Sequence, residues 1–102
     1  MKNQWTLTVT SPLGEEPYNM TIQESSDGIK AFVSDKNGRG SATLTEVIGQ
    51  DSLVLSAKIE TPMRTTVYLY PYDKNFVNNQ SFNGILKIGE FSEMLVSGVK
   101  ND

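Results

Sequence analysis

Apolar side chains recur at every second position along most of this chain. Between Gln4 and Thr10, for example, Trp5, Leu7 and Val9 alternate with polar residues. A period of two places successive side chains on opposite faces of a β-strand, and no window shows helical apolar spacing of convincing length. The expected strands span residues 4–10, 17–24, 29–34, 41–48, 53–60, 64–72, 80–88 and 91–99.

Turn signals separate these runs and decide how the strands connect. Pro and Gly occur in Ser11-Pro12-Leu13-Gly14, and Ser25-Ser26-Asp27-Gly28 ends in a pair that favours tight hairpins. Consecutive short strands joined by tight turns favour an antiparallel meander with one apolar face. Closing the sheet hides that face and removes both edges. We predict an all-β chain that forms an eight-stranded antiparallel up-and-down barrel, as a single domain over residues 1–102.

One short phrase occurs twice, fifty positions apart. Val9-Thr10-Ser11-Pro12-Leu13 returns as Ile59-Glu60-Thr61-Pro62-Met63. Tyr18 and Met20 follow the first copy at the distance at which Tyr68 and Tyr70 follow the second. This indicates an internal two-fold duplication, with halves of about 4–50 and 53–100. If both copies share a register, Tyr68 and Tyr70 point into the barrel.

The alternation defines the side chains expected inside the barrel. They are Trp5, Leu7, Val9, Tyr18, Met20, Ile22, Ile29, Ala31, Val33, Leu44, Leu55, Ala57, Ile59, Tyr68, Tyr70, Phe82, Leu86, Met94 and Val96. A barrel of this size is either filled by its side chains or able to hold one small ligand. The sequence leaves both interpretations open.

The composition excludes several kinds of chemistry. There is no Cys and no His, which removes the thiolate nucleophile and the commonest metal ligand and general base. The net charge is −3 and the basic residues are scattered, so we expect no nucleic-acid partner. We expect no metal and no cofactor. The N-terminus leads directly into a strand pattern and no run approaches a membrane span, so we expect a cytoplasmic protein without membrane contact.

Several of these features resemble the small bacterial calycin-like, or lipocalin-like, barrel domains, a family of largely unassigned function. The features are Trp5 on the first strand, the two Pro-containing turns, Gly84, Gly89-Glu90-Phe91 and Ser97-Gly98-Val99-Lys100. The resemblance implies a barrel that holds a ligand. It also implies that Lys100 from the last strand covers the Trp5 indole as a structural closure, at a place where Arg is more usual in the family.

The hypothesis that follows is binding of a small apolar or aromatic molecule inside the barrel. Loops after odd-numbered strands share one end of an up-and-down barrel, and this end is the expected entrance. The candidate ligand-binding residues are Tyr18, Met20, Leu13, Met63, Tyr68, Tyr70, Phe82 and Met94.

Two alternatives remain at this point. One is a cofactor-independent isomerase or cyclase that uses barrel tyrosines and a carboxylate, for which Glu46 and Glu93 are candidates. The other is a ligand-free interaction module. A homodimer could form through apolar side chains expected on the outside, which are Phe32, Val54, Val67, Leu69 and Ile85. A carboxylate and a tyrosine hydroxyl that converge on a cavity would favour catalysis, whereas an apolar cavity alone would favour binding.

Overall fold

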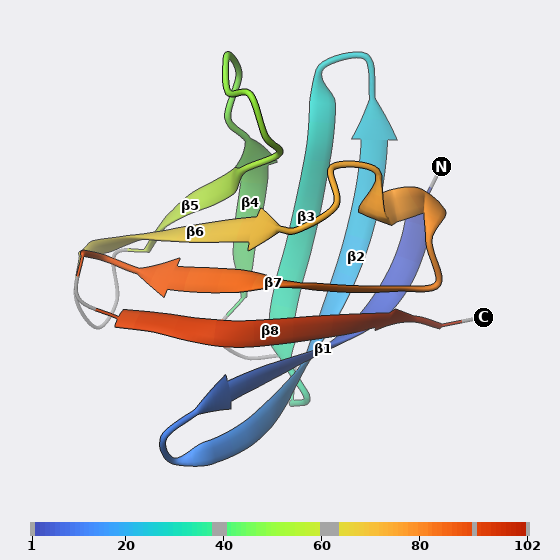
Figure 1. The fold of residues 1–102 in the computed structure, drawn as a ribbon. Helices are drawn as coiled ribbons and strands as arrows, with labels where there is room; N and C mark the ends of the chain where they lie inside the picture. The colour runs from blue at the N-terminus through green and yellow to red at the C-terminus, as the bar shows by residue number, and fades with distance from the viewer. Residues whose placement is uncertain (1, 38–40, 60–63, 91, 102) are drawn as a thin grey trace.

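The strands of this chain close into a barrel. The computed structural model describes residues 2–37, 41–59, 64–90 and 92–101. Within these ranges, eight antiparallel strands pair with their sequence neighbours, and the last pairs with the first, as the prediction required (Figure 1). The elements are β1 (Lys2–Ser11), β2 (Gly14–Ser25), β3 (Gly28–Asp35), β4 (Ala42–Glu46), β5 (Leu55–Ile59), β6 (Thr65–Pro71), the 3-10 helix η1 (Phe76–Asn78), β7 (Ser81–Ile88) and β8 (Ser92–Lys100).

Two hairpins turn through glycine. Ser11 pairs with Gly14, and Ser25 pairs with Gly28, so each turn has two central residues. Gly14 has φ 118° and Gly28 has φ 116°, which are backbone conformations that residues with a Cβ rarely adopt. The Asp27-Gly28 hairpin is therefore confirmed, whereas β2 begins at Gly14, three residues earlier than predicted.

The β4–β5 connection departs most from the expected strand lengths. β4 ends at Glu46 and β5 begins at Leu55, and only Thr45 and Glu46 of β4 pair with β5. The Glu46 carboxylate accepts a hydrogen bond of 3.1 Å from the backbone N–H of Ile29. Glu46 thereby ties the end of β4 to the start of β3 and lies far from the entrance end, although it was one of the carboxylates considered for catalysis.

The β5–β6 hairpin corrects the prediction for Tyr68 and Tyr70. Val9 pairs with Glu16, seven positions later, but its repeat equivalent Ile59 pairs with Thr65, only six positions later. A register change of one residue exchanges the faces of a strand. Tyr68 and Tyr70 consequently lie on the outer surface, half-buried, with their rings stacked at 6.1 Å between centroids.

The same register change removes the surface patch that was expected to support a homodimer. Leu69 is 1% exposed, and Val67 and Val54 are also buried. Phe32, at 40% exposure, does face outward, and Ile85 lies on the outer face opposite Tyr70 and Leu95. The expectation that Val67 and Leu69 point outward was wrong, and Val54 is not exposed, so the dimer prediction loses the patch on which it depended.

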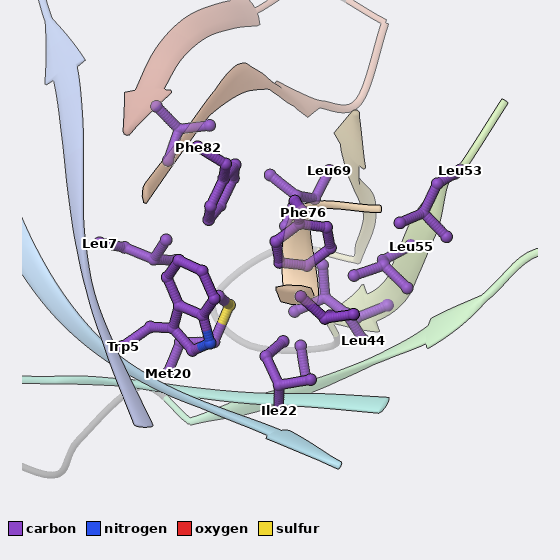
Figure 2. Packing of buried hydrophobic residues seen from close by; sticks show 14 of the residues in the cluster. Trp5, Leu7, Met20, Ile22, Leu44, Leu53, Leu55, Leu69, Phe76 and Phe82 are labelled. Carbon is purple, nitrogen blue, oxygen red and sulfur yellow. The ribbon is translucent and has the colours of Figure 1, made fainter. Parts of the chain in front are cut away.

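One end of the barrel is closed by aromatic side chains. η1 places Phe76 and Val77 in the core beside the start of β1 and the end of β8 (Figure 1). The Phe76 ring lies 4.6 Å from Phe82 and 5.7 Å from Trp5, and Trp5 meets Phe82 edge-on at 5.5 Å between centroids. Figure 2 shows Phe76 between these two aromatic side chains and the aliphatic side chains of β4 and β5. We call Trp5, Phe76 and Phe82 the aromatic floor.

Lys100 joins β8 to this floor. Its Nζ lies 5.3 Å from the centroid of the Trp5 ring, so the contact implied by the family resemblance is present. The same Nζ donates a hydrogen bond of 2.8 Å to the carbonyl of Val77 in η1. The Asp73 carboxylate accepts bonds from the Asn75 backbone N–H and from the Asn79 amide, and these hold the pKa of Asp73 below its ordinary value. The polar loop therefore fixes the helix that closes the barrel.

Gly98 is where β8 passes the aromatic floor. It pairs with Phe82 across the strands, and a Cβ on Gly98 would lie 2.3 Å from Cε1 of the Phe82 ring. The absence of a side chain at Gly98 leaves the space that this ring occupies.

Candidate ligand-binding cavity

Above the aromatic floor, the interior of the barrel holds a cavity of about 280 Å³. It extends toward the end where β1 connects to β2 and β7 to β8, which is the predicted entrance. Twelve of its described lining residues are apolar: Leu7, Val9, Val33, Ala42, Leu44, Ile59, Val67, Leu69, Leu86, Ile88, Met94 and Val96. Three are polar: Ser11, Glu16 and Tyr18.

The cavity follows from the sizes of the inward side chains. The closed end of the barrel is filled by the three rings of the aromatic floor together with Met20 and Ile22, all of which are buried. Nearer the entrance the inward side chains are mostly alanine, valine and leucine, which are too short to meet at the barrel axis. Eight strands enclose a space that side chains of ordinary size fill or leave open for one small ligand. This barrel is filled at one end and open for a small molecule at the other.

The polar side chains of the cavity gather at its entrance. Glu16 is in the inward phase of β2, paired with Val9, and is solvent-exposed, so the cavity reaches the surface there. The Tyr18 hydroxyl donates a hydrogen bond of 3.0 Å to Oε2 of Glu16. Ser11 lies at the end of β1, where its hydroxyl donates to the carbonyl of Gly14 at 3.3 Å and accepts from the N–H of Leu13 at 3.2 Å.

The surroundings of Tyr18 raise the pKa of its hydroxyl. Burial is the largest cause, followed by the hydrogen bond to Glu16 and the negative charges of Glu16 and Asp35. The ionised phenol is disfavoured in the folded chain. Stability contributed by Tyr18 is therefore complete below its ordinary pKa of 10.0 and is lost as the pH rises through the raised value.

This pKa leads to a spectroscopic prediction. An absorbance titration of phenolate in the folded protein is expected to contain a component above pH 10.0 that Tyr18→Phe removes. Glu16→Gln should move that component toward lower pH without abolishing the shift, because burial remains. Glu15→Gln, on the neighbouring outward position, should leave it in place. A titration that Tyr18→Phe does not alter at its high-pH end would contradict the assignment.

The predicted ligand-binding residues fall into four groups. Tyr18 and Met94 line the cavity. Met20 and Phe82 are buried in the filled end and do not reach the cavity wall. Tyr68 and Tyr70 lie outside the barrel, and Leu13 is 98% exposed at the tip of its turn, so the structure places none of these three at the cavity. Met63 lies outside the described residues.

Sequence reasoning missed Glu16 as a cavity residue. The expected strand begins at residue 17 and leaves out Glu15 and Glu16, but β2 begins at Gly14 and both glutamates belong to it. The signal was present, because Glu16, Tyr18 and Met20 follow one another in the same phase of the alternation. The second carboxylate considered for catalysis, Glu93, lies on the outer face of β8, where its Oε1 is 3.8 Å from Nζ of Lys87.

Among the described residues, no group of three or more His, Cys, Asp or Glu side chains is placed so that it could hold a metal ion. Over those same ranges, none of the helical structure is long and apolar enough to cross a membrane.

Comparison with known proteins finds no family model, no curated protein and no solved structure that matches this chain.

Proposed function

We propose that this protein binds one small, largely apolar molecule inside the open half of its barrel. The observation that carries the proposal is the cavity of about 280 Å³, whose described lining has twelve apolar residues and a polar entrance. Ligand pockets in proteins are typically concave and mostly apolar, with a few placed polar groups. The resemblance to calycin-like barrels supports the same function.

The volume limits the size of the bound molecule. A cavity of roughly 150 Å³ accommodates benzene, with six carbon atoms, so a cavity about twice as large suits about a dozen non-hydrogen atoms. A bicyclic aromatic with one short substituent, such as naphthylmethanol, has this size and has no charge. We therefore use it as the neutral probe, with an expected Kd of about 10 to 100 μM from the binding free energy that small ligands reach per atom.

A substitution that fills the cavity provides the test. Ala42 lines the cavity wall on β4, and the next residue, Thr43, is exposed on the outer face. Ala42→Phe is expected to weaken naphthylmethanol binding by about ten-fold or more, because its ring occupies ligand volume. Thr43→Phe adds the same ring outside and should leave Kd unchanged. Calorimetry on the three proteins measures this, with circular dichroism to confirm that each is folded.

Equal binding to wild-type protein and Ala42→Phe would place the probe elsewhere and contradict the proposal. Failure of wild-type protein to bind the probe, together with native mass spectrometry that finds no molecule retained by protein purified from its own host, would also contradict it. A retained molecule would instead identify the class of ligand directly.

Catalysis is a second candidate, favoured by one observation: a carboxylate and a tyrosine hydroxyl meet at the cavity entrance. Tyr18 is poorly suited to act as a base, since its raised pKa keeps it protonated. Glu16 is the group that would move a proton. Recovery of a retained ligand in altered form from wild-type protein, but unaltered from Glu16→Gln, would favour the enzyme over the binder.

A further inference from the structure

The polar atoms at the cavity entrance can accept hydrogen bonds but have few protons left to donate. The Tyr18 proton is directed to Glu16, and the Ser11 proton is directed to the carbonyl of Gly14. An ionised glutamate has no proton to donate, and hydroxyl oxygens keep acceptor lone pairs when their protons are engaged. The three described polar side chains that line the cavity therefore offer hydrogen-bond acceptors to a ligand.

Glu16 adds a negative charge to this set. Across the described ranges it forms no ion pair with a lysine or arginine, and its one side-chain hydrogen bond is with Tyr18. Asp35, opposite Tyr18 on β3, adds a second negative charge nearby. Lys36 and Arg64 also lie toward this end of the barrel, but neither lines the cavity. Among the described residues that line the cavity, Glu16 is the one charged side chain.

The other described residues of the cavity wall are apolar, so among them the polar group of a bound molecule has one favourable place, beside Glu16 and Tyr18. An unpaired polar group on the apolar wall would lose its hydrogen bonds to water without replacement. We propose that the cavity selects molecules with a small apolar body and a protonated amine, and that the amine donates to the carboxylate of Glu16 at the entrance. This inference depends on the proposed binding function and specifies its ligand class.

The same geometry disfavours anionic ligands. A carboxylate on a matched ligand would meet Glu16 at close range and would find acceptors where it needs donors. Short-chain acids of the right size should therefore bind less tightly than the neutral alcohol. The cavity thus discriminates by charge at one end only, while the apolar body is bound by shape and burial.

Three ligands with one skeleton test the proposal: naphthylmethylamine, naphthylmethanol and naphthoate, measured by calorimetry at neutral pH. Glu16 is exposed, so the ionic contribution is that of a partly screened pair, and we expect the amine to bind about three- to ten-fold more tightly than the alcohol. Naphthoate should bind about three- to ten-fold more weakly than the alcohol. The preference for the amine should decrease as the salt concentration rises.

Glu16→Gln removes the charge and keeps an oxygen that can accept the Tyr18 proton. In this variant the amine and the alcohol should bind with nearly equal Kd, and naphthoate should gain affinity. Glu15→Gln is the matched control, because Glu15 carries the same charge one position away on the outer face, paired with Thr10. It should leave the three affinities unchanged.

The outcomes separate the two proposals. If naphthylmethanol binds and Ala42→Phe weakens it, but the amine has no advantage, the cavity is a binding site and the charge selection is wrong. If the amine is preferred equally in wild-type protein and in Glu16→Gln, Glu16 is not the group that selects it and the inference is overturned. If none of the three ligands binds, the inference fails, and the binding function fails with it when native mass spectrometry also finds no retained molecule.

Discussion

Replacing Trp5 with alanine is expected to lower the free energy of unfolding by about 3 to 5 kcal/mol, the range for removing a large buried aromatic side chain. Trp5 is fully buried and contacts both phenyl rings of the aromatic floor and the Lys100 ammonium. Its loss leaves a void between β1 and η1 that the neighbouring side chains can only partly fill. Urea unfolding followed by circular dichroism measures the change.

Trp5→Phe is the control for this prediction. Among the described residues, no partner accepts a hydrogen bond from the buried Nε1 of Trp5, so removing that N–H costs no hydrogen bond. Phenylalanine keeps an aromatic ring beside Phe76 and Phe82. We therefore expect Trp5→Phe to be clearly less destabilising than Trp5→Ala. A loss below about 1 kcal/mol for Trp5→Ala would show that the floor does not depend on Trp5.

Gly98→Ala is expected to lower the free energy of unfolding by about 2 to 3 kcal/mol, the usual range for overpacking a well-filled core. The new Cβ would lie 2.3 Å from Cε1 and 2.8 Å from Cδ1 of Phe82. The ring cannot move aside freely, because Trp5 and Phe76 pack against it. The clash outweighs the gain that alanine brings over glycine in the unfolded chain. Thermal and urea unfolding both report this loss.

A double-mutant cycle identifies the cause. Phe82→Leu removes the ring that the new Cβ would meet, so Gly98→Ala should cost much less in that background than in the wild-type chain. An equal cost in both backgrounds would mean that Phe82 is not responsible. Ser97→Ala, on the outer face of the same strand, is the matched control and should change stability by less than about 0.5 kcal/mol.

The fold could be predicted from this sequence because one signal dominates it. Alternation in β1, β3 and β7 defines both the strands and their inward faces, and the Gly-containing hairpins fix the pairing of neighbours. Phe32 illustrates this: its phase alone placed it on the outside, where the structure has it 40% exposed. Closure followed from the need to hide a single apolar face.

The face of β6 could not be predicted, because both of its faces are apolar enough to be buried. Val67 and Leu69 alternate with Tyr68 and Tyr70, and the repeated phrase favoured the tyrosines. The register after Ile59 determines which face is buried, because Ile59 pairs with a residue six positions later whereas Val9 pairs with a residue seven positions later. A sequence repeat preserves residue types, but a single change in hairpin register reverses which of them are buried.

The sequence left open whether the barrel is filled or holds a cavity, and it identified the residues of the cavity only in part. Tyr18 and Met94 were assigned correctly to the inward face and line it. The sequence did not show that Phe76 and Val77, in a polar loop, would form a short helix that fills the far end. That helix completes the core cluster to which Met20 and Phe82 belong. These two inward residues therefore lie in the filled end and not in the cavity wall.

The chain contains a single tryptophan, and it lies in the aromatic floor. Its fluorescence emission therefore reports on one end of the barrel alone, and its full burial implies a blue-shifted maximum and little quenching by dissolved acrylamide. The chain has three tyrosines besides Tyr18, so the difference in tyrosine absorbance between the wild-type chain and Tyr18→Phe reports on the opposite end. Following both signals during one denaturation experiment can show whether the two ends of the barrel melt together or in succession.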